Sequence, residues 1–458
     1  MKKILFIVDH KHRDLSSNAL IGYFLNRFGF QVKFCAVWRE EHIVKDFKPD
    51  CIVLPKPIYH DHVFAKWRIN NIKILVLDVE GNLQSKEKGF LIPKIFPDVY
   101  FYWNDKIFDL QKKFFEEKSN IFTGNVPQMI TLGCPRLDFH HSRLRDIFET
   151  KEKIKENFKI PLNKKIITIA TASGSAGQKM EDKKIIQENL NRRNSAPPNY
   201  FLESKNYEDL REKTLEIILK LNKNYKNTYH VVLKPHPNEA IQFWEKFILD
   251  NKIKNITLIK GNSINNLLYI SDVHISHNVC TSTFESMLHK IPSIEIHGPL
   301  SKTTCSEIDL KLPLFTLNKS NEIDKILQLI FEDYLSSSKE SFKKANNFCK
   351  KYYGDFDGNR CLDHARFIES FMRKKHLNLN IFKKAAIFYK FIFLKWLIDF
   401  KNKFKNFSIK KLINKLKGIP NYDIDSVSNK IDGRGRFDKL MSEGEEKIWL
   451  QKFSKIKL

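Results

Sequence analysis

Short apolar runs alternate with charged, helix-like stretches along the first two thirds of the chain. Such runs, rich in Val, Ile, Leu and Phe, are typical of strands that are buried on both faces of a parallel sheet. Those in the first part of the chain lie at residues 3–8, 31–37, 51–55, 73–78, 99–104 and 128–138. Apolar residues at helical spacing separate them, as in residues 16–29. This alternation predicts a doubly wound parallel sheet.

The same pattern restarts after a charged connection. Its predicted strands lie at residues 165–173, 230–235, 256–261, 272–276 and 292–298. A polar stretch at residues 174–198 predicts a long loop. The fold class is therefore α/β, with two tandem Rossmann-like domains facing a cleft and a C-terminal basic amphipathic helical tail. The predicted segments are residues 1–150, residues 151–338, closing helices at 339–372 and the tail at 373–458.

The C-terminal tail holds much of the net positive charge, which changes the interpretation of that charge. The net charge is +26, and residues 372–417 hold fourteen Lys and Arg residues and one Asp, which is half of the excess. Lysines fall on one half of a helical wheel, and aromatic and aliphatic residues fill the rest. Residues 373–417 are thus predicted to form a basic amphipathic helix on the inner membrane surface. The alternative is a helix packed on the protein's own core.

Cysteine usage and hydropathy exclude several classes of protein. Seven cysteines are scattered singly without a CxxC pair, which indicates reduced thiols in the cytoplasm and no zinc site. The apolar run at the N-terminus is five residues long and leads into His, Lys and Arg, so a first strand is favoured over a signal peptide. No uncharged apolar run approaches the ~20 residues of a membrane span. The basic residues cluster with Phe, Trp and Ile without a recognition motif, so no nucleic-acid partner is expected.

The segment VVLKPHPNEA at residues 231–240 ends a predicted strand in a stiff loop. Two prolines with fixed φ bracket His236, and ligand-binding groups of α/β proteins lie at the carboxyl ends of strands. We predict that His236 donates to a phosphate and that Lys234 adds charge. A plain turn residue and a solvated lysine are the alternatives.

A Ser/Thr-rich segment begins the helix that follows the strand at 272–276. Thr281, Ser282 and Thr283 place hydroxyls and free backbone N–H groups at the start of this helix, which is an anion site by construction. The alternative is that these hydroxyls only cap the helix.

Three motifs in order carry a family resemblance: GCPRLD, KPHPNE and SDVHISHNVCTSTFESMLHKIPSIEIHG. Over residues 1–370 the chain resembles bacterial surface carbohydrate biosynthesis glycosyltransferases of the GT-B fold, including Kdo transferases that use CMP-Kdo. The His-Pro element is also similar to that of sialyl- and polysialyltransferases. The resemblance implies a CMP-sugar donor in the second half and a glycan or glycolipid acceptor in the first half. It implies neither a metal nor another cofactor.

The resemblance also implies site residues. Those of the CMP-sugar site are His236, Lys234, Ser276, Asn278, Thr281, Ser282, Thr283 and Glu285. Glu285 would accept from ribose hydroxyls. Glu80 resembles a Glu-Gly pair of the family, and Asp138 ends a run similar to Gly-Asn-Pro-Arg-x-Asp. These two are the predicted catalytic carboxylates.

Several assignments stay open at this point. Cys134 stands where the family has Asn, which removes support for a role there. Asp138 would instead cap the next helix, and Arg136 would pair with an acidic neighbour. His10 and Arg13 follow the first strand and would contact the acceptor or the sugar carboxylate, or lie in a solvated loop.

The predicted function is transfer of Kdo or a nonulosonic acid to a cell-surface polysaccharide or lipid-linked glycan. The enzyme would be cytoplasmic and peripheral at the inner face of the membrane. Alternatives of the same fold are a CDP-glycerol or CDP-ribitol polyol-phosphate transferase, a UDP- or GDP-hexose transferase, and a sugar-nucleotide epimerase-like enzyme. A nucleic-acid-binding protein is the non-enzyme alternative.

Overall fold

The computed structural model describes most of the chain. The described residues are 1–37, 39–56, 61–78, 97–117, 127–145, 147–174, 176–193, 199–237, 239–259, 261–277, 280–299, 313–374, 380–393, 396–397, 441 and 444–455.

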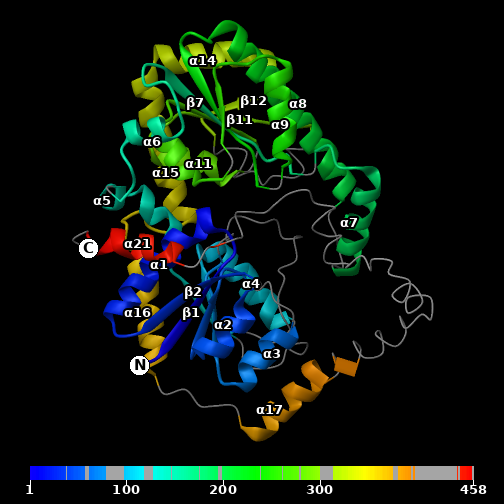
Figure 1. Ribbon diagram of the computed structural model, residues 1–458, viewed down its shortest axis with the longest axis vertical. Helices are drawn as coiled ribbons and strands as arrows, with labels where there is room; N and C mark the ends of the chain where they lie inside the picture. Colours follow the sequence, from blue (N-terminus) through cyan, green and yellow to red (C-terminus); the bar gives the residue numbers. More distant parts are fainter. Residues whose placement is uncertain are drawn as a thin grey trace, which may run out of the picture.

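The first half is a parallel sheet with helices on both faces (Figure 1). Among the described residues its strand order is β2-β1-β3-β4-β5-β6. Its strands are β1 (Lys3–Val8), β2 (Gln31–Ala36), β3 (Cys51–Leu54), β4 (Lys73–Val76), β5 (Val99–Tyr102) and β6 (Gln128–Thr131). Its helices are α1 (Lys11–Arg27), α2 (Glu40–Phe47), α3 (Asp61–Ile69), α4 (Asp105–Glu117), the 3-10 helix η2 (Pro135–His140) and α5 (Ser142–Arg145). β1, β3 and β5 are almost wholly buried, as their continuous apolar runs predict.

The second half repeats this architecture with the order β12-β11-β10-β7-β8-β9 in the described chain. Its strands are β7 (Lys165–Ala170), β8 (Tyr229–Lys234), β9 (Ile256–Leu258), β10 (Val273–His277), β11 (Ser293–Ile296) and β12 (Phe315–Leu317). Its helices are α6 (Lys151–Asn157), α7 (Met180–Arg193), α8 (Tyr200–Asn224), α9 (Ile241–Asp250), α10 (Ile264–Tyr269), α11 (Thr281–Leu288), the 3-10 helix η3 (Ser320–Glu322), α14 (Ile323–Glu332) and α15 (Tyr334–Tyr352). The predicted fold class of two tandem Rossmann-like domains is confirmed.

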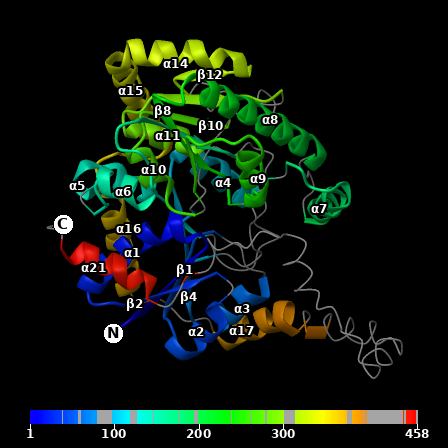
Figure 2. The same ribbon diagram turned by 45° about the horizontal axis from the view of Figure 1, so that its top comes forward.

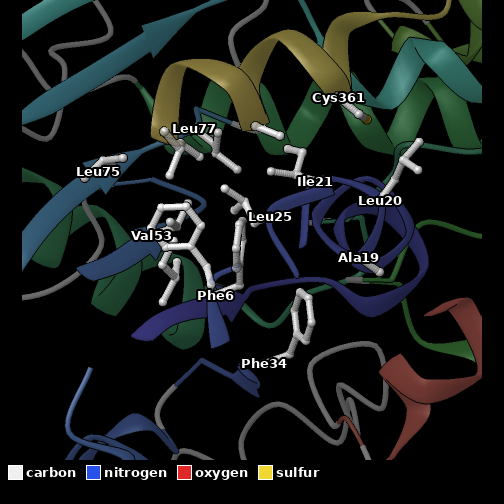
Figure 3. Packing of buried hydrophobic residues seen from close by; sticks show 14 of the residues in the cluster. Phe6, Ala19, Leu20, Ile21, Leu25, Phe34, Val53, Leu75, Leu77 and Cys361 are labelled. Carbon is white, nitrogen blue, oxygen red and sulfur yellow. The ribbon is translucent and has the colours of Figure 1, made fainter. Parts of the chain in front are cut away.

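The chain returns to the first half after α15. Helix α16 (Arg360–Arg373) packs on α1 (Figures 1 and 2), and its Cys361 and Ile368 are fully buried in the core of the first sheet. Figure 3 shows Cys361 near Leu20 and Ile21 of α1 in this core. Two glycines, Gly133 and Gly354, allow the crossing loops to touch. A Cβ on Gly133, whose φ is +80°, would lie 2.8 Å from the carbonyl oxygen of Tyr353, and a Cβ on Gly354, whose φ is +89°, would lie 2.7 Å from the Cα of Gly133.

Several segments differ from the prediction. The strand predicted at residues 128–138 ends at Thr131, and Pro135–His140 form the 3-10 helix η2, because Pro135 ends the extended run and suits the first turn of a helix. Helix α7 occupies most of the stretch predicted as a loop, because Met180–Arg193 contains no Gly or Pro and consists mainly of good helix formers. Helix α21 (Glu445–Ser454), within the predicted tail, packs on α1, and its Phe453 is fully buried.

The beginning of the tail packs partly on the protein itself. Helix α17 (Ile381–Ile387) continues into a π-helical turn, η4 (Phe388–Phe393), and both contact α3. Ile387 and Phe391 are buried there, while Phe382 is 82% exposed. No helix in the described residues has the length and apolar content that crossing a membrane requires.

Candidate functional site

A cavity of about 700 Å³ lies between the two halves, at the carboxyl ends of their strands. Residues that follow β1, β3, β7 and β8 line it, together with the starts of α10 and α11. Because the carboxyl ends of parallel strands share one edge of a sheet, both halves present their loops to the same space. Of the predicted residues, His10, Arg13, Lys234, His236, Thr281, Ser282 and Glu285 line this cavity.

The Lys-Pro-His-Pro loop is held by a carboxylate that the sequence interpretation did not single out. Glu239 Oε1 accepts from Thr171 Oγ1 at 2.6 Å, from the Ser173 amide at 2.7 Å and from the His236 amide at 3.3 Å. Its Oε2 accepts from Trp244 Nε1 at 3.0 Å. Burial raises the pKa of Glu239, although these donors oppose the shift. The imidazole of His236 remains exposed at the cavity.

The start of α11 faces the cavity as well. Its N-cap residue is Cys280, which makes no side-chain capping hydrogen bond, so Thr281 and Ser282 are not the caps. Ser282 Oγ donates to Cys280 Sγ at 2.9 Å and lies 3.0 Å from His274 Nε2. The first backbone N–H groups of an α-helix have no partner within the helix, and they favour an anion. The start of α11 can therefore bind a phosphate.

Two of the predicted hydroxyls lie elsewhere. Ser276 and Thr283 are fully buried and do not line the cavity. Ser276 Oγ lies 2.7 Å from Thr283 Oγ1, which donates to Glu295 Oε1 at 2.7 Å. These hydroxyls stabilise the packing of α11 on its sheet, so the structure does not support the predicted contact with a substrate. Asn278 lies outside the described residues.

Glu285, in the second half of the chain, contacts two basic side chains of the first half. Its Oε1 lies 3.2 Å from Arg136 Nη2, and its Oε2 lies 3.3 Å from His140 Nε2. The predicted pairing of Arg136 with an acidic neighbour is thus confirmed. Burial on its own raises the pKa of Glu285, but Arg136 and His140 outweigh it and hold the pKa below its ordinary value. Glu285 therefore carries a negative charge at neutral pH, and its remaining lone pairs can still accept.

A histidine chain orients this carboxylate. Arg145 Nη2 donates to His289 Nδ1 at 2.9 Å, and His289 Nε2 lies 2.9 Å from His140 Nδ1. Burial, together with His140 and Arg145, lowers the pKa of His289 well below its ordinary value, so His289 is neutral. His289 Nε2 then carries the proton and lies within donating distance of both Asn265 Oδ1, at 2.7 Å, and His140 Nδ1, while His140 Nε2 faces Glu285. The sequence interpretation missed this chain, because its members are far apart along the chain.

Asp138 faces α16 instead of the cavity. Its carboxylate is buried and accepts from the backbone N–H groups of Arg360 at 3.0 Å and Cys361 at 2.6 Å. Burial raises the pKa of Asp138 to about 6, against these two donors. The geometry favours a capping role over the catalytic one, but the helix that Asp138 caps is α16 and not the next helix along the chain, as the alternative had it. Glu80, the other predicted catalytic carboxylate, lies outside the described residues.

The first-half side of the cavity is lined by charged residues that include the start of α1. Arg13 lies 2.6 Å from Asp14 and 3.5 Å from Asp9, while Lys56 lies 3.4 Å from Asp9. Arg13 is therefore held in an ion-pair network, and the fully solvated alternative does not apply. No cluster of three or more His, Cys, Asp or Glu side chains suited to a metal is present among the described residues.

Comparisons with known proteins agree on the fold. S. aureus MnaA in a co-structure with UDP aligns with a TM-score of 0.51 and 13% identity, over 83% of this chain and 100% of that chain. The wall teichoic acid polymerase TagF, as a variant soaked with CDPG, aligns with a TM-score of 0.51 and 12% identity, over 82% of this chain and 90% of that chain. At such identities the likeness shows the fold alone, which is the GT-B arrangement. No protein-family model matches the chain, and no curated protein matches its sequence.

Proposed function

We propose that the protein is a GT-B glycosyltransferase that moves an acidic sugar, Kdo or a nonulosonic acid, from a CMP-sugar to a surface glycan. One observation carries the proposal: His236, Lys234 and the start of α11 meet in a single cavity between two Rossmann-like halves. These groups suit one phosphate, and nearby cations suit the carboxylate of an acidic sugar. The acceptor would be a cell-surface polysaccharide or a lipid-linked glycan.

In the proposed transfer, one bond forms at the anomeric carbon of the sugar as another breaks. An acceptor hydroxyl oxygen attacks the anomeric carbon while the bond from that carbon to the phosphate oxygen breaks. The electron pair leaves with CMP, and the hydroxyl proton passes to a carboxylate, for which we propose Glu80. His236 and the N–H groups of α11 stabilise the negative charge that develops on the phosphate. Asp138 takes no part in this scheme, because it caps α16.

The alternative is a donor with two phosphates. A cavity of about 700 Å³ has room for either kind of donor. TagF was soaked with CDPG and MnaA was bound to UDP, which makes a CDP-polyol and a UDP-sugar the donors to compare. Both alternatives would use the same His236 and α11 groups.

A thermal-shift panel tests the proposal. The purified protein is heated with CMP, CDP, UDP, GDP or ADP, and the same panel is run on His236→Ala. The matched control is His42→Ala, an exposed histidine on α2 away from the cavity. A ligand at about 100 times its Kd stabilises the folded state by about 2.7 kcal/mol.

Stabilisation by CMP that is lost in His236→Ala and kept in His42→Ala supports the CMP-sugar donor. A larger shift with CDP indicates polyol-phosphate transfer, and one with UDP or GDP indicates hexose transfer. If no nucleotide stabilises the protein, the proposed donor site is wrong.

We also propose that the protein works at the inner face of the cytoplasmic membrane, held there through residues 373–417. The outer side of α17 and η4 supports this. Phe388, Tyr389 and Trp396 are 50%, 62% and 54% exposed, and Lys383 and Lys390 are exposed beside them. Tyr389, Phe393 and Trp396 also stack in a row. Exposed rings flanked by lysines are typical of helices that lie in an anionic membrane surface.

A further inference from the structure

The C-terminal helix α21 is anchored next to the cavity. Its Phe453 is fully buried between α1 and η2, where it contacts the rings of Tyr23 and Phe139. Trp449 packs against Phe139 and Phe148. Figures 1 and 2 both show α21 lying against α1 where the two halves meet. This aromatic packing fixes the helix in position.

The other side of α21 forms part of the cavity wall. Glu445, Ile448, Trp449 and Lys452 line it from one helix face. Lys11 Nζ, from the start of α1, pairs with Glu445 Oε1 at 3.1 Å and so fixes the beginning of α21 against α1. Ile448 is 57% exposed, although the rest of the helix is anchored. A large apolar side chain is thus presented to the cavity.

The chemistry of this wall suits an anionic sugar. The Lys452 ammonium lies 5.1 Å from the centroid of the Trp449 ring and makes no ion pair with any described residue. An indole and an aliphatic side chain offer apolar surface to the C–H face of a sugar, and a cation beside them attracts a carboxylate or phosphate. The side chains needed to bind a charged carbohydrate therefore come together on one helix.

We propose that α21 and the start of α1 form an acceptor subsite for an anionic sugar. Lys452 is the residue that makes this subsite prefer anionic over neutral sugars. This inference rests on the proposed function, since it names the acceptor chemistry of the same cavity. The donor groups lie on the second half, at His236 and α11, while α21 packs on the first half. A sugar bound at α21 would thus face the donor across the cavity.

Calorimetric titration of the full chain tests the subsite. The probes are trigalacturonic acid, the neutral trisaccharide maltotriose, and glucose 6-phosphate, which separates carboxylate from phosphate recognition. The variants are Lys452→Glu, the conservative Lys452→Arg, and Lys447→Glu, an exposed lysine of the same helix that does not line the cavity. CMP is titrated into each variant as well.

We expect one equivalent of an anionic probe to bind and maltotriose to bind much more weakly. Lys452→Glu should weaken anionic binding about tenfold or more, as expected for the loss of a charge-assisted contact. Lys452→Arg should restore binding, and Lys447→Glu should leave it unchanged. The proposed subsite would be wrong if the anionic probes bound equally to all variants, or if neither anionic probe bound. Absence of CMP binding in every variant would instead count against the donor proposal alone.

Discussion

Glu239 is the residue that connects the Lys-Pro-His-Pro loop to the end of β7. Its two oxygens accept from four groups, which come from Thr171, Ser173, His236 and Trp244. The sequence identified the stiff loop through its prolines but gave no reason to assign Glu239 a role. A carboxylate three residues after a histidine is read as a solvated charge until its donors are known.

We predict that Glu239→Ala lowers the free energy of unfolding by about 3 kcal/mol, because buried donors lose their acceptor. The same change should weaken nucleotide binding, since His236 is no longer held. Chemical denaturation and the nucleotide panel measure the two effects. Glu212→Ala, at an exposed position of α8, is the control and should change neither. A Glu239→Ala protein of unchanged stability would contradict this role.

Arg136 and Glu285 form a buried ion pair between the halves, at 3.2 Å. We predict that Arg136→Leu lowers the free energy of unfolding by about 3–5 kcal/mol, because it leaves a buried carboxylate without its main partner. Adding Glu285→Gln should recover part of this loss, which a double-mutant cycle in urea measures. Lys246→Ala, which breaks an exposed ion pair with Asp250, should cost less than about 1 kcal/mol. Additive effects of the two substitutions would contradict the coupling.

At the scale of elements, periodicity predicted most strands to within a few residues. β1 occupies the predicted residues 3–8, and β8 ends at Lys234 as the prolines require. Helix α7 was missed because a polar, charged helix lacks an apolar stripe and resembles a loop. Helix α21 was missed because it lies in a basic tail, and only contacts with distant residues show that it is anchored.

Helix α17 and η4 pack one face against α3, and their other face is exposed to solvent. We predict that replacing Phe388, Tyr389 and Trp396 together by Ser reduces binding to phosphatidylglycerol vesicles about tenfold or more, because exposed apolar area drives insertion. Co-sedimentation measures the bound fraction. Leu249→Ser, at a 76% exposed position of α9, is the control. Equal binding of the triple variant, or no vesicle binding by the parent protein, would contradict membrane association through this surface.

At the scale of the whole molecule, buried neutral histidines couple stability to pH. Burial lowers the pKa of His277 to about 3 and the pKa values of His274 and His364 to about 4. An unfolded histidine titrates near 6.5, so below this pH the unfolded state binds more protons than the folded state. Stability is therefore lost as the pH falls from about 6.5 towards 4.

We predict that each of these histidines accounts for about 2 kcal/mol of the loss between pH 7 and pH 5. Urea denaturation of the parent protein at pH 7 and pH 5 measures the total. His364→Gln should reduce the difference between the two pH values, and His42→Gln, at an exposed site, should not. Stability that is the same at both pH values would contradict the coupling.

The sequence by itself determined the two Rossmann-like halves and the cavity that their loops share. Continuous apolar runs have to be buried on both faces, which requires parallel sheets covered by helices. The carboxyl ends of such strands share an edge, so the His236 loop and the start of α11 had to face one space. This reasoning placed His10, Arg13, Lys234, Thr281 and Ser282 at the cavity as well, whereas Glu285 was expected there from the family resemblance.

Only the tertiary structure decided which polar groups face the cavity and which support it. Thr283 directly follows Ser282, which lines the cavity, yet its hydroxyl bonds to Ser276 and Glu295 in the interior. Asp138 faces α16, more than two hundred residues further along the chain. Local pattern sets which face of its own element a side chain occupies. The partners on that face come from distant segments, and these are set only when the segments pack together.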